Sequence, residues 1–427
     1  NAKSTYVELE GTITYKDAAV LGGTIGEMHA KKIANLYEKA MKMGAPVIGL
    51  IDCAGLRLQE ATDALDGFGQ IYKNMSLASG IVPQITAVYG ECGGGLAVLA
   101  ELSDFVFVEE KKAKLFVNSP NALDGNYESK LDTSSAEFMA KAGVADFIGD
   151  EETIANGVRQ LVSMLPSNNE EGAVYTDNQD DLNRVCADMS AEIADAALAL
   201  TDISDDGLFV EVKAEYAKEM VTGFIQLDGV TVGAVANRTA IYDENGEKAE
   251  EFAAVLTTDG AYKAAEFVTF CNAFEIPVLS LTNVKGFEAN VRAEKTIAKA
   301  AAKLVYAFSN ADVPKVNVIT GEAYGSAYVA MNSKSVGADM VYAWSQASIG
   351  MMDASLAAKI MYADEIAAAD DVTAKINEKA SEYAALQSSV EQAAARGYVD
   401  TIINPEDTRK YIIAAFEMLS FRHRCGP

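Results

Sequence analysis

The chain has 427 residues, half of them hydrophobic and 23% charged, which is enough apolar material for two domains of about 200 residues each. Its formal net charge of -27 argues against nucleic-acid or anionic-membrane partners, because either would require a basic face. Five scattered cysteines, two histidines and the lack of an apolar run of roughly 20 residues predict a cytoplasmic protein with no metal site and no membrane insertion.

The chain begins with a strand-turn-strand pattern at residues 7–14, and a matching pattern returns at residues 225–232. An apolar segment that starts at Leu208 and a polar stretch precede the second copy, whereas almost nothing precedes the first. The chain also starts at Asn1 without a methionine. We therefore expect the N-terminus of the natural protein to lie further upstream.

Helix and strand signals alternate after each of these patterns. Apolar residues at helical spacing predict helices at residues 26–43 and 69–79 in the first copy, and at residues 259–274 and 296–309 in the second. Short strands rich in Val, Ile and Leu follow Pro46, Pro83, Pro277 and Pro314. Continuous apolar strands that alternate with helices are typical of buried parallel sheets, so we predict an α/β fold.

The two copies repeat at a constant offset. Pro46 and Pro277 are 231 positions apart, and so are Pro83 and Pro314, so no insertion separates the matched strands. An offset held over this distance indicates two structurally similar halves.

The boundary between the halves is expected at residues 166–180, where Pro, Ser, Asn and acidic residues follow one another without periodicity. This gives an N-terminal domain at residues 1–170 and a C-terminal domain at residues 180–427. The alanine-rich tract at residues 366–395 has a helical composition, and we expect it to pack internally or against another protomer.

Glycine-rich turns follow the matched strands of each copy. A strand that ends in Gly and opens a helix leaves backbone N–H groups available for developing negative charge. The candidates are Gly55, Leu56, Gly93, Gly94 and Gly95 in the first half, and Gly286, Phe287, Gly325, Ser326 and Ala327 in the second. Each half can thus form an oxyanion hole from two loops. The alternative is that the glycines only allow a helix to pack tightly against the sheet.

Several segments carry a resemblance to a known family. Residues 52–60 look like a DSGGARxQE motif, and residues 83–96 with 104–108 resemble an IPQ…GxCxGG…TDFxFM segment. Residues 312–344 resemble a VPK…AYGGAY…GADxxYAWP segment, and residues 404–409 are similar to IDPRDTR. By these motifs the chain resembles the biotin-dependent acyl-CoA carboxyltransferases over nearly its whole length.

The resemblance implies two duplicated crotonase-like domains and the transfer of a carboxyl group between carboxybiotin and the α-carbon of an acyl-CoA. The N-terminal half would hold the coenzyme A thioester and the C-terminal half the biotin, each with an oxyanion hole and no need for a histidine. Carried over by position, Gly94 and Gly95 would act on the thioester, and Ser326 and Ala327 on biotin.

The resemblance also implies partners. Biotin would be attached to a separate carrier protein, the biotin carboxyl carrier protein. Biotin carboxylase or membrane decarboxylase subunits would complete the enzyme. The chain itself would form a homo-oligomer, either a dimer or a trimer of dimers.

Two further features qualify this interpretation. Lys31 and Lys32 are candidates for neutralising coenzyme A phosphates, although a solvated lysine pair is the simpler explanation. The segment from Lys285 to Glu288 replaces Pro-Gly-Phe and a Gly-containing loop of the family pattern, and Ser326 replaces a glycine. The alternative functions are a biotin-independent crotonase-type acyl-CoA enzyme and a non-catalytic scaffold or carrier-docking subunit.

Overall fold

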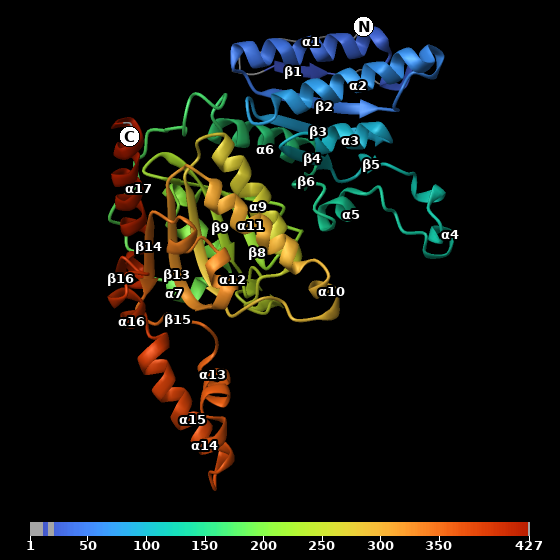
Figure 1. The fold of residues 1–427 in the computed structure, drawn as a ribbon. Helices are drawn as coiled ribbons and strands as arrows, with labels where there is room; N and C mark the ends of the chain where they lie inside the picture. The colour runs from blue at the N-terminus through green and yellow to red at the C-terminus, as the bar shows by residue number, and fades with distance from the viewer. Residues whose placement is uncertain (1–11, 16–20, 426–427) are drawn as a thin grey trace. The chain divides into compact units, whose positions relative to one another are not determined.

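The computed structural model describes residues 12–15 and 21–425, and Figure 1 shows their path. The chain divides into two compact units. The first contains the chain up to Val174, together with residues 212–217 and 273–275, and the second contains the remaining residues from Tyr175 onward. The predicted domains were continuous, so the prediction did not include the two short segments of the later chain that belong to the first unit.

The sheet of the first unit is parallel throughout its described strands. The strand order is β1-β2-β3-β4-β6, and β5 extends the edge of β3. The strands are β1 (Thr12–Tyr15), β2 (Val47–Cys53), β3 (Gln84–Gly93), β4 (Phe105–Glu109), β5 (Lys114–Phe116) and β6 (Phe147–Gly149). Of the predicted hairpin at residues 7–14, only residues 12–14 are described, and they belong to β1.

Two long helices, α1 (Glu27–Met43) and α2 (Ala61–Ala78), lie side by side against one face of this sheet (Figure 1). Their apolar faces, with Tyr37, Phe68 and Met75, join strand residues such as Val88 in one core cluster. The remaining helices of the unit are α3 (Gly95–Glu101), α4 (Asn126–Ser129), α5 (Ala136–Lys141) and α6 (Glu151–Met164).

The predicted helix at residues 69–79 is longer than expected, because α2 already begins at Ala61. Gly69, the first residue of the predicted helix, lies inside α2, as does Gly67. A Cβ atom at Gly67 would lie 2.6 Å from Cβ of Ala30, so this glycine permits close contact between α1 and α2. The glycine therefore marks a helix–helix approach and not a boundary.

The second unit contains a larger sheet with the order β16-β14-β13-β12-β9-β8-β7, and β15 extends the edge of β13. The predicted hairpin at residues 225–232 is confirmed, because β8 and β9 are antiparallel neighbours. The strands β9, β12, β13, β14, β15 and β16 pair in parallel. The strands are β7 (Phe209–Val212), β8 (Met220–Leu227), β9 (Val230–Asn237), β12 (Val278–Val284), β13 (Lys315–Tyr324), β14 (Met340–Trp344), β15 (Ser348–Gly350) and β16 (Thr401–Ile403).

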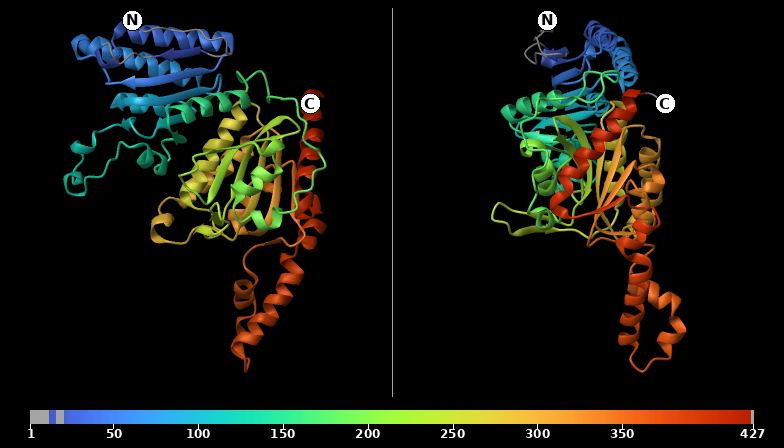
Figure 2. Two further views of the ribbon diagram at one scale, coloured as in Figure 1. Left: turned by 180° about the vertical axis from the view of Figure 1, so that it is seen from behind. Right: turned by 90° about the vertical axis from the view of Figure 1, so that its left-hand side faces the viewer.

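Helices cover this sheet on both faces, as Figure 2 shows. Side chains from α8 and α17, including Leu200 and Phe416, join strand residues such as Leu279 and Val316 in one core cluster. Helices α9 and α11 lie on the opposite face (Figure 1). The elements are α7 (Met189–Glu192), α8 (Ala196–Ile203), α9 (Thr258–Ala273), α10 (Val291–Glu294), α11 (Ile297–Asn310), α12 (Gly325–Ala330), α17 (Thr408–Cys425), and the hairpin β10 (Ala240–Tyr242) and β11 (Lys248–Glu251).

Helices α13 (Ala354–Met361), α14 (Ala363–Ala367) and α15 (Val372–Tyr383) form a helical arm that projects from the second unit (Figure 2). The alanine-rich tract begins in this arm and ends in α16 (Val390–Ala395), where Val390 and Ala393 pack in a core cluster with strand residues. The predicted helical composition is confirmed, but the tract is broken twice. The side chains of Asp371 and Ser389 accept backbone N–H bonds and cap new helices at these points. No helix in the described part of the chain is long and apolar enough to cross a membrane.

Candidate functional site

Both units carry the same irregularity at the ends of their two central strands. The pairing of β2 with β3 shifts register before Cys53, which faces Cys92. The pairing of β12 with β13 shifts at the matching point, where Val284 faces Ala323. Both shifts stand directly before the predicted turns, and the residues involved are again 231 positions apart. The duplication therefore extends to the local distortion that shapes the candidate site.

A side chain at matching positions of the two units, Asp52 or Asn283, holds each distortion. Oδ1 of Asp52 accepts the backbone N–H of Glu91 at 3.2 Å, and Oδ1 of Asn283 accepts that of Glu322 at 3.0 Å. The residue before each N–H is a glycine. A Cβ atom at Gly90 would lie 2.1 Å from Asp52, and one at Gly321 would lie 2.6 Å from Asn283, so neither position has room for a side chain.

The loop after β2 is fixed by a short parallel bridge. The N–H of Ile25 donates to the carbonyl of Gly55, and the N–H of Arg57 donates to the carbonyl of Ile25, both at 2.9 Å. In a parallel bridge the residue between these two groups directs its own N–H to the opposite side. The N–H of Leu56 is therefore directed away from Ile25, as a donor to a ligand must be.

The loop after β12 repeats this arrangement. The N–H of Leu256 donates to the carbonyl of Gly286 at 2.9 Å, and the N–H of Glu288 donates to the carbonyl of Leu256 at 3.0 Å. The N–H of Phe287 is consequently directed away from Leu256, like that of Leu56 in the first unit. A Cβ atom at Gly286 would meet nothing within 4 Å, so steric crowding does not explain this glycine.

The turn after β3 supplies the second set of donors in the first unit. Gly94 has φ +63° and ψ -128°, a conformation that side chains rarely adopt, and it precedes the first residue of α3. Its own N–H donates to the carbonyl of Phe116 at 2.8 Å. The expectation that Gly94 contributes its N–H therefore needs revision. The candidates in this turn are the N–H groups of Gly95 and Leu96, the first two of the helix.

Gly95 is also required by packing. A Cβ atom there would lie 2.7 Å from Oη of Tyr72 and 2.8 Å from the ring of Phe68. Oη of Tyr72 donates to the carbonyl of Gly95 at 2.5 Å and fixes the orientation of the Gly95–Leu96 peptide, and burial raises the pKa of this phenol. Packing thus requires a glycine at position 95, and the Tyr72 bond orients the peptide that carries the N–H of Leu96.

The turn after β13 has the same backbone path with other side chains. Gly325 has φ +63°, and a Cβ atom there would lie 3.1 Å from the carbonyl oxygen of Met351. Ser326 and Ala327 follow in α12 at the positions of Gly95 and Leu96. Ser326 is exposed and Ala327 is buried. The structure therefore brings each predicted set of glycine-rich residues to the ends of neighbouring strands within its own unit.

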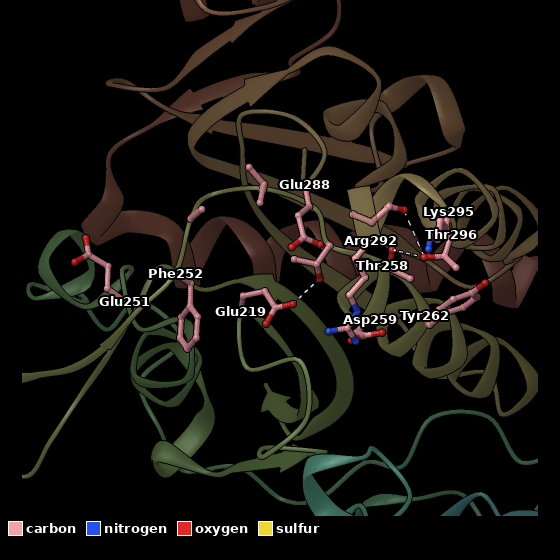
Figure 3. A pocket seen from close by; sticks show the side chains of 14 residues that line it. Glu219, Glu251, Phe252, Thr258, Asp259, Tyr262, Glu288, Arg292, Lys295 and Thr296 are labelled. Carbon is pink, nitrogen blue, oxygen red and sulfur yellow. Dashed lines mark hydrogen bonds between the residues drawn. The ribbon is translucent and has the colours of Figure 1, made fainter. Parts of the chain in front are cut away.

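A cavity of about 730 Å³ opens in the second unit beside the loop of Phe287. Val255 and Thr257, on either side of Leu256, line it together with Glu288, which follows Phe287. Figure 3 shows Arg292 and Lys295 on one side of the cavity and the carboxylate of Glu219 hydrogen-bonded to Thr257. The other lining residues are Glu251, Phe252, Ala253, Thr258, Asp259, Tyr262, Ala293 and Thr296.

Lys31 and Lys32 lie on the first turns of α1, outside the turns just described. The ammonium of Lys31 bonds the carboxylate of Glu27, which raises the pKa of the lysine. The N-terminus of the helix is already occupied, because the carboxylate of Glu60 accepts the N–H of Glu27 and an N–H of Arg57, and these bonds lower the pKa of Glu60. Neither lysine is part of the candidate oxyanion hole.

Sequence reasoning missed three groups that shape the site. Asp52 and Asn283 hold the strand ends, Tyr72 orients the Gly95–Leu96 peptide, and the ammonium of Lys285 pairs with the carboxylate of Glu322 at 2.8 Å. The constant offset of 231 residues could have revealed the first pair, since Asp52 and Asn283 occupy matching positions. No pattern in the sequence links Tyr72 with Gly95, because this contact depends on how α2 packs.

Comparison with known proteins gives a consistent result. Residues 9–426 match the carboxyl transferase domain family. The chain is 38% identical to the methylmalonyl-CoA decarboxylase subunit alpha of Propionigenium modestum, over 97% of this chain and 81% of the relative. It is also 38% identical to the propionyl-CoA carboxylase carboxyltransferase subunit of Haloferax mediterranei, over 96% of this chain and 80% of the relative.

A solved structure agrees with these relatives. The crystal structure of transcarboxylase 12S, described as a hexamer assembly with methylmalonyl-coenzyme A and methylmalonic acid bound, has a TM-score of 0.88 and 35% sequence identity. The similarity covers 96% of this chain and 79% of the other. The fold expected from the resemblance, an α/β carboxyltransferase architecture, is confirmed by this match.

Proposed function

The chain belongs to the carboxyl transferase family, and from this relation we propose how its two sets of loops divide the reaction. The chain is the carboxyltransferase component of a biotin-dependent acyl-CoA carboxylase or decarboxylase, as the sequence motifs predicted. Such an enzyme moves a carboxyl group between carboxybiotin and an acyl-CoA. Both reactants develop negative charge on a carbonyl oxygen, so each needs its own set of donors.

In the first unit, the loops after β2 and β3 hold the thioester of the acyl-CoA. The N–H groups of Leu56 and Gly95 are the proposed donors to the thioester oxygen, with Leu96 beside them, while Gly55, Gly93 and Gly94 shape the turns. Support comes from the parallel bridge that turns the N–H of Leu56 outward and from the Tyr72 bond to the carbonyl of Gly95, which orients the peptide that carries the N–H of Leu96. Backbone donors of this kind act without a titrating base.

In the second unit, the loops after β12 and β13 hold the ureido group of biotin. The N–H groups of Phe287, Ser326 and Ala327 are the proposed donors to its oxygen, and Gly286 and Gly325 shape the turns. The single observation that supports a second hole is the duplicated register shift, which gives both units the same strand ends and the same turns. The assignment of biotin to this hole follows the resemblance to the carboxyltransferase family.

The cavity beside Phe287 is the proposed place for the bicyclic ring and arm of biotin. The ring system is uncharged and carries two N–H donors and one carbonyl acceptor, so it suits a wall that mixes carboxylates with cationic and hydroxyl groups. Glu219 and Glu288 offer acceptors, and Arg292 and Thr258 offer donors.

Lys31 and Lys32 are the proposed contacts for the phosphates of coenzyme A. Lys31 occupies the position that Tyr262 has in the second unit, 231 residues later, and Tyr262 lines the cavity there. The matching surface of the first unit is therefore a reasonable place for the adenine-phosphate end of the substrate. Two ammonium groups would offset phosphate charge on a protein with a net charge of -27.

The proposed partners are a biotin carboxyl carrier protein and either a biotin carboxylase or the membrane subunits of a decarboxylase, in the cytoplasm. A homo-oligomer, such as a trimer of dimers, is proposed because the related 12S protein is described as a hexamer. The arm offers a surface for it, because Leu356, Ile360, Met361 and Val372 expose 46% to 62% of their surface.

One assay tests this function against its alternatives. Purified protein is incubated with methylmalonyl-CoA and with propionyl-CoA plus carboxybiotin, in the presence and absence of free biotin or biotinylated carrier. Carboxyl transfer that requires biotin is the expected result. Turnover that does not require biotin would instead favour a crotonase-type enzyme. Binding of acyl-CoA without turnover would favour a scaffold.

A further inference from the structure

An ion pair joins the two loops of the second oxyanion hole. Nζ of Lys285 lies 2.8 Å from Oε2 of Glu322. Lys285 directly precedes Gly286 in the loop after β12, and Glu322 stands three residues before Gly325 at the end of β13. The pair therefore stands between the two turns that supply the proposed donors. Its side chains are 57% and 34% exposed, so a ligand can reach the ammonium.

The surroundings of the pair keep the lysine charged. Its pKa is raised, first by the hydrogen bond to Glu322 and the charge of that carboxylate, and further by the carboxylate of Asp353. Tyr324 lies on β13 and donates its Oη–H to Oγ of Ser348 at 2.9 Å, and Asp353 precedes α13. Burial raises the pKa of the Tyr324 phenol, so this neighbour stays neutral when the lysine is charged.

The first unit has no ammonium at the corresponding place. Ala54 stands where Lys285 stands in the second unit. The counterpart of Glu322 is Glu91, which lies opposite Lys114 in the strand register, and that lysine pairs with Asp132 at 2.6 Å. The first loop instead carries Arg57, whose guanidinium pairs with Glu60 at 2.8 Å, so an ammonium directly before the glycine of the loop distinguishes the second hole.

We propose that Lys285 stabilises the negative charge that develops on the ureido oxygen of biotin in the second hole, and that Glu322 holds the ammonium in place. The inference rests on the assignment of biotin to the second unit. An ammonium has three N–H donors, and Glu322 engages one of them, so two remain for a ligand oxygen.

The charge arises in a balanced step. When a carboxyl group leaves carboxybiotin, the N–C bond breaks and its electron pair stays on the ureido group, which then takes the proton released from the α-carbon of the acyl-CoA. The electron pair of that C–H bond forms the new C–C bond with the carboxyl carbon. The decarboxylase direction reverses these changes. In both directions the ureido oxygen carries excess negative charge between the two bond changes.

This role explains why the ammonium is partly exposed in the free protein. Water screens the charge while the site is open, and a bound ligand that excludes water strengthens the interaction with a donor already in place. The charge of Glu322 reduces the cost of holding a cation in a covered site. A backbone N–H cannot supply a full charge, so the lysine adds a positive charge that the backbone donors of the duplicated turns lack.

The test uses Lys285→Met, Lys285→Arg and Glu322→Gln in the full chain, with Lys334→Met as a matched control. Lys334 belongs to the same unit and pairs with Asp400 at 2.7 Å, away from both loops. Biotin-dependent turnover of methylmalonyl-CoA gives kcat and the KM for free biotin. Titration of Lys285 by NMR, after reductive methylation with ¹³C, gives its pKa without any turnover.

We expect Lys285→Met to lower kcat by about 10- to 100-fold, below the loss of about 100- to 1,000-fold for a fully enclosed donor. The KM for biotin and the melting temperature should stay close to wild type, Lys285→Arg should recover part of kcat, and Lys334→Met should change nothing. In Glu322→Gln the pKa of Lys285 should fall.

Three results would overturn the inference. Wild-type kcat in Lys285→Met shows that the charge is not used. Equal losses of kcat and of thermal stability in Lys285→Met and Lys285→Arg show a packing role. An unchanged lysine pKa in Glu322→Gln shows that the pair does not form. A wild-type protein with no biotin-dependent turnover overturns the proposed function itself, and this outcome is separate because the NMR titration still reports on the pair.

Discussion

In the first unit Gly93 lies opposite Phe116 in the strand register, whereas in the second unit Tyr324 lies opposite Gly350. The large and the small residue have exchanged strands. A Cβ atom at Gly93 would lie 2.8 Å from the Phe116 ring, so the space between these paired residues holds one large side chain and not two. The exchange shows how a duplicated turn keeps its backbone path while the side chains around it diverge.

The same comparison shows which side chains each position of the duplicated turns can accept. Asp52 and Asn283 both accept a backbone N–H at the strand end, so an uncharged amide suffices there. Gly95 has Phe68 and Tyr72 against it, whereas Ser326 has Lys299 and Lys303 at the matching positions of α11. The second unit could therefore accept a serine where the first requires a glycine.

The largest loss of folding stability is expected when Gly95, in the turn after β3, is replaced by alanine. Gly95→Ala places a Cβ atom 2.7 Å from Oη of Tyr72, and overpacking of this kind costs about 1 to 3 kcal/mol. Ser326→Ala, at the matching position, should stay within about 0.5 kcal/mol of wild type because Ser326 is exposed. Thermal unfolding of both variants measures the difference. Equal losses would contradict the unequal packing described here.

A smaller loss of folding stability is expected from changes at the ends of the central strands. Asp52→Ala removes the acceptor of the Glu91 N–H and should cost about 1 kcal/mol, while Asp52→Asn should be nearly neutral because the second unit uses an amide at this position. Denaturant unfolding compares the two variants. If the asparagine variant is as unstable as the alanine variant, the carboxylate has a role that Asn283 does not share.

The proposed phosphate contacts predict a selective change in binding. Lys32→Met should raise the KM for the acyl-CoA about two- to fivefold, the range of an exposed ion pair, and should leave the KM for biotin unchanged. Lys31→Met should act in the same direction. Added salt should reduce the effect because exposed charges are screened. A rise in the KM for biotin instead would place these lysines at the other reactant.

The smallest effect concerns two buried side chains at matching positions, Gln84 and Lys315. Nε2 of Gln84 donates to the carbonyl of Met75, and Nζ of Lys315 donates to the carbonyls of Phe308 and Ala311. Burial lowers the pKa of Lys315, with Asp339 and Asp312 opposing the shift. The folded state therefore binds fewer protons than the unfolded chain just below pH 10.5, so stability rises with pH in that window.

Lys315→Gln copies the first unit and should flatten this rise while the fold is retained. Urea unfolding at several pH values between 8 and 10.5 gives the slope for wild type and variant. An unchanged slope would assign the pH dependence to other groups.

Much of this arrangement was predictable from the sequence. The helices at residues 26–43, 259–274 and 296–309, the parallel strands and the glycine-rich turns follow from periodicity and from the offset of 231 residues. The start of α2 and the use of the Gly94 N–H did not follow. Both depend on contacts between distant segments, Ala30 with Gly67 and Phe116 with Gly94, which no local pattern encodes.

The central claim is that each unit provides donors for one reactant, and amide hydrogen exchange tests it most directly. Exchange is followed by mass spectrometry, at the resolution of short peptides, in the protein alone, with propionyl-CoA and with free biotin. The account predicts that propionyl-CoA slows exchange at Leu56, Gly95 and Leu96, and that biotin slows exchange at Phe287, Ser326 and Ala327. Protection of the same unit by both ligands would contradict it.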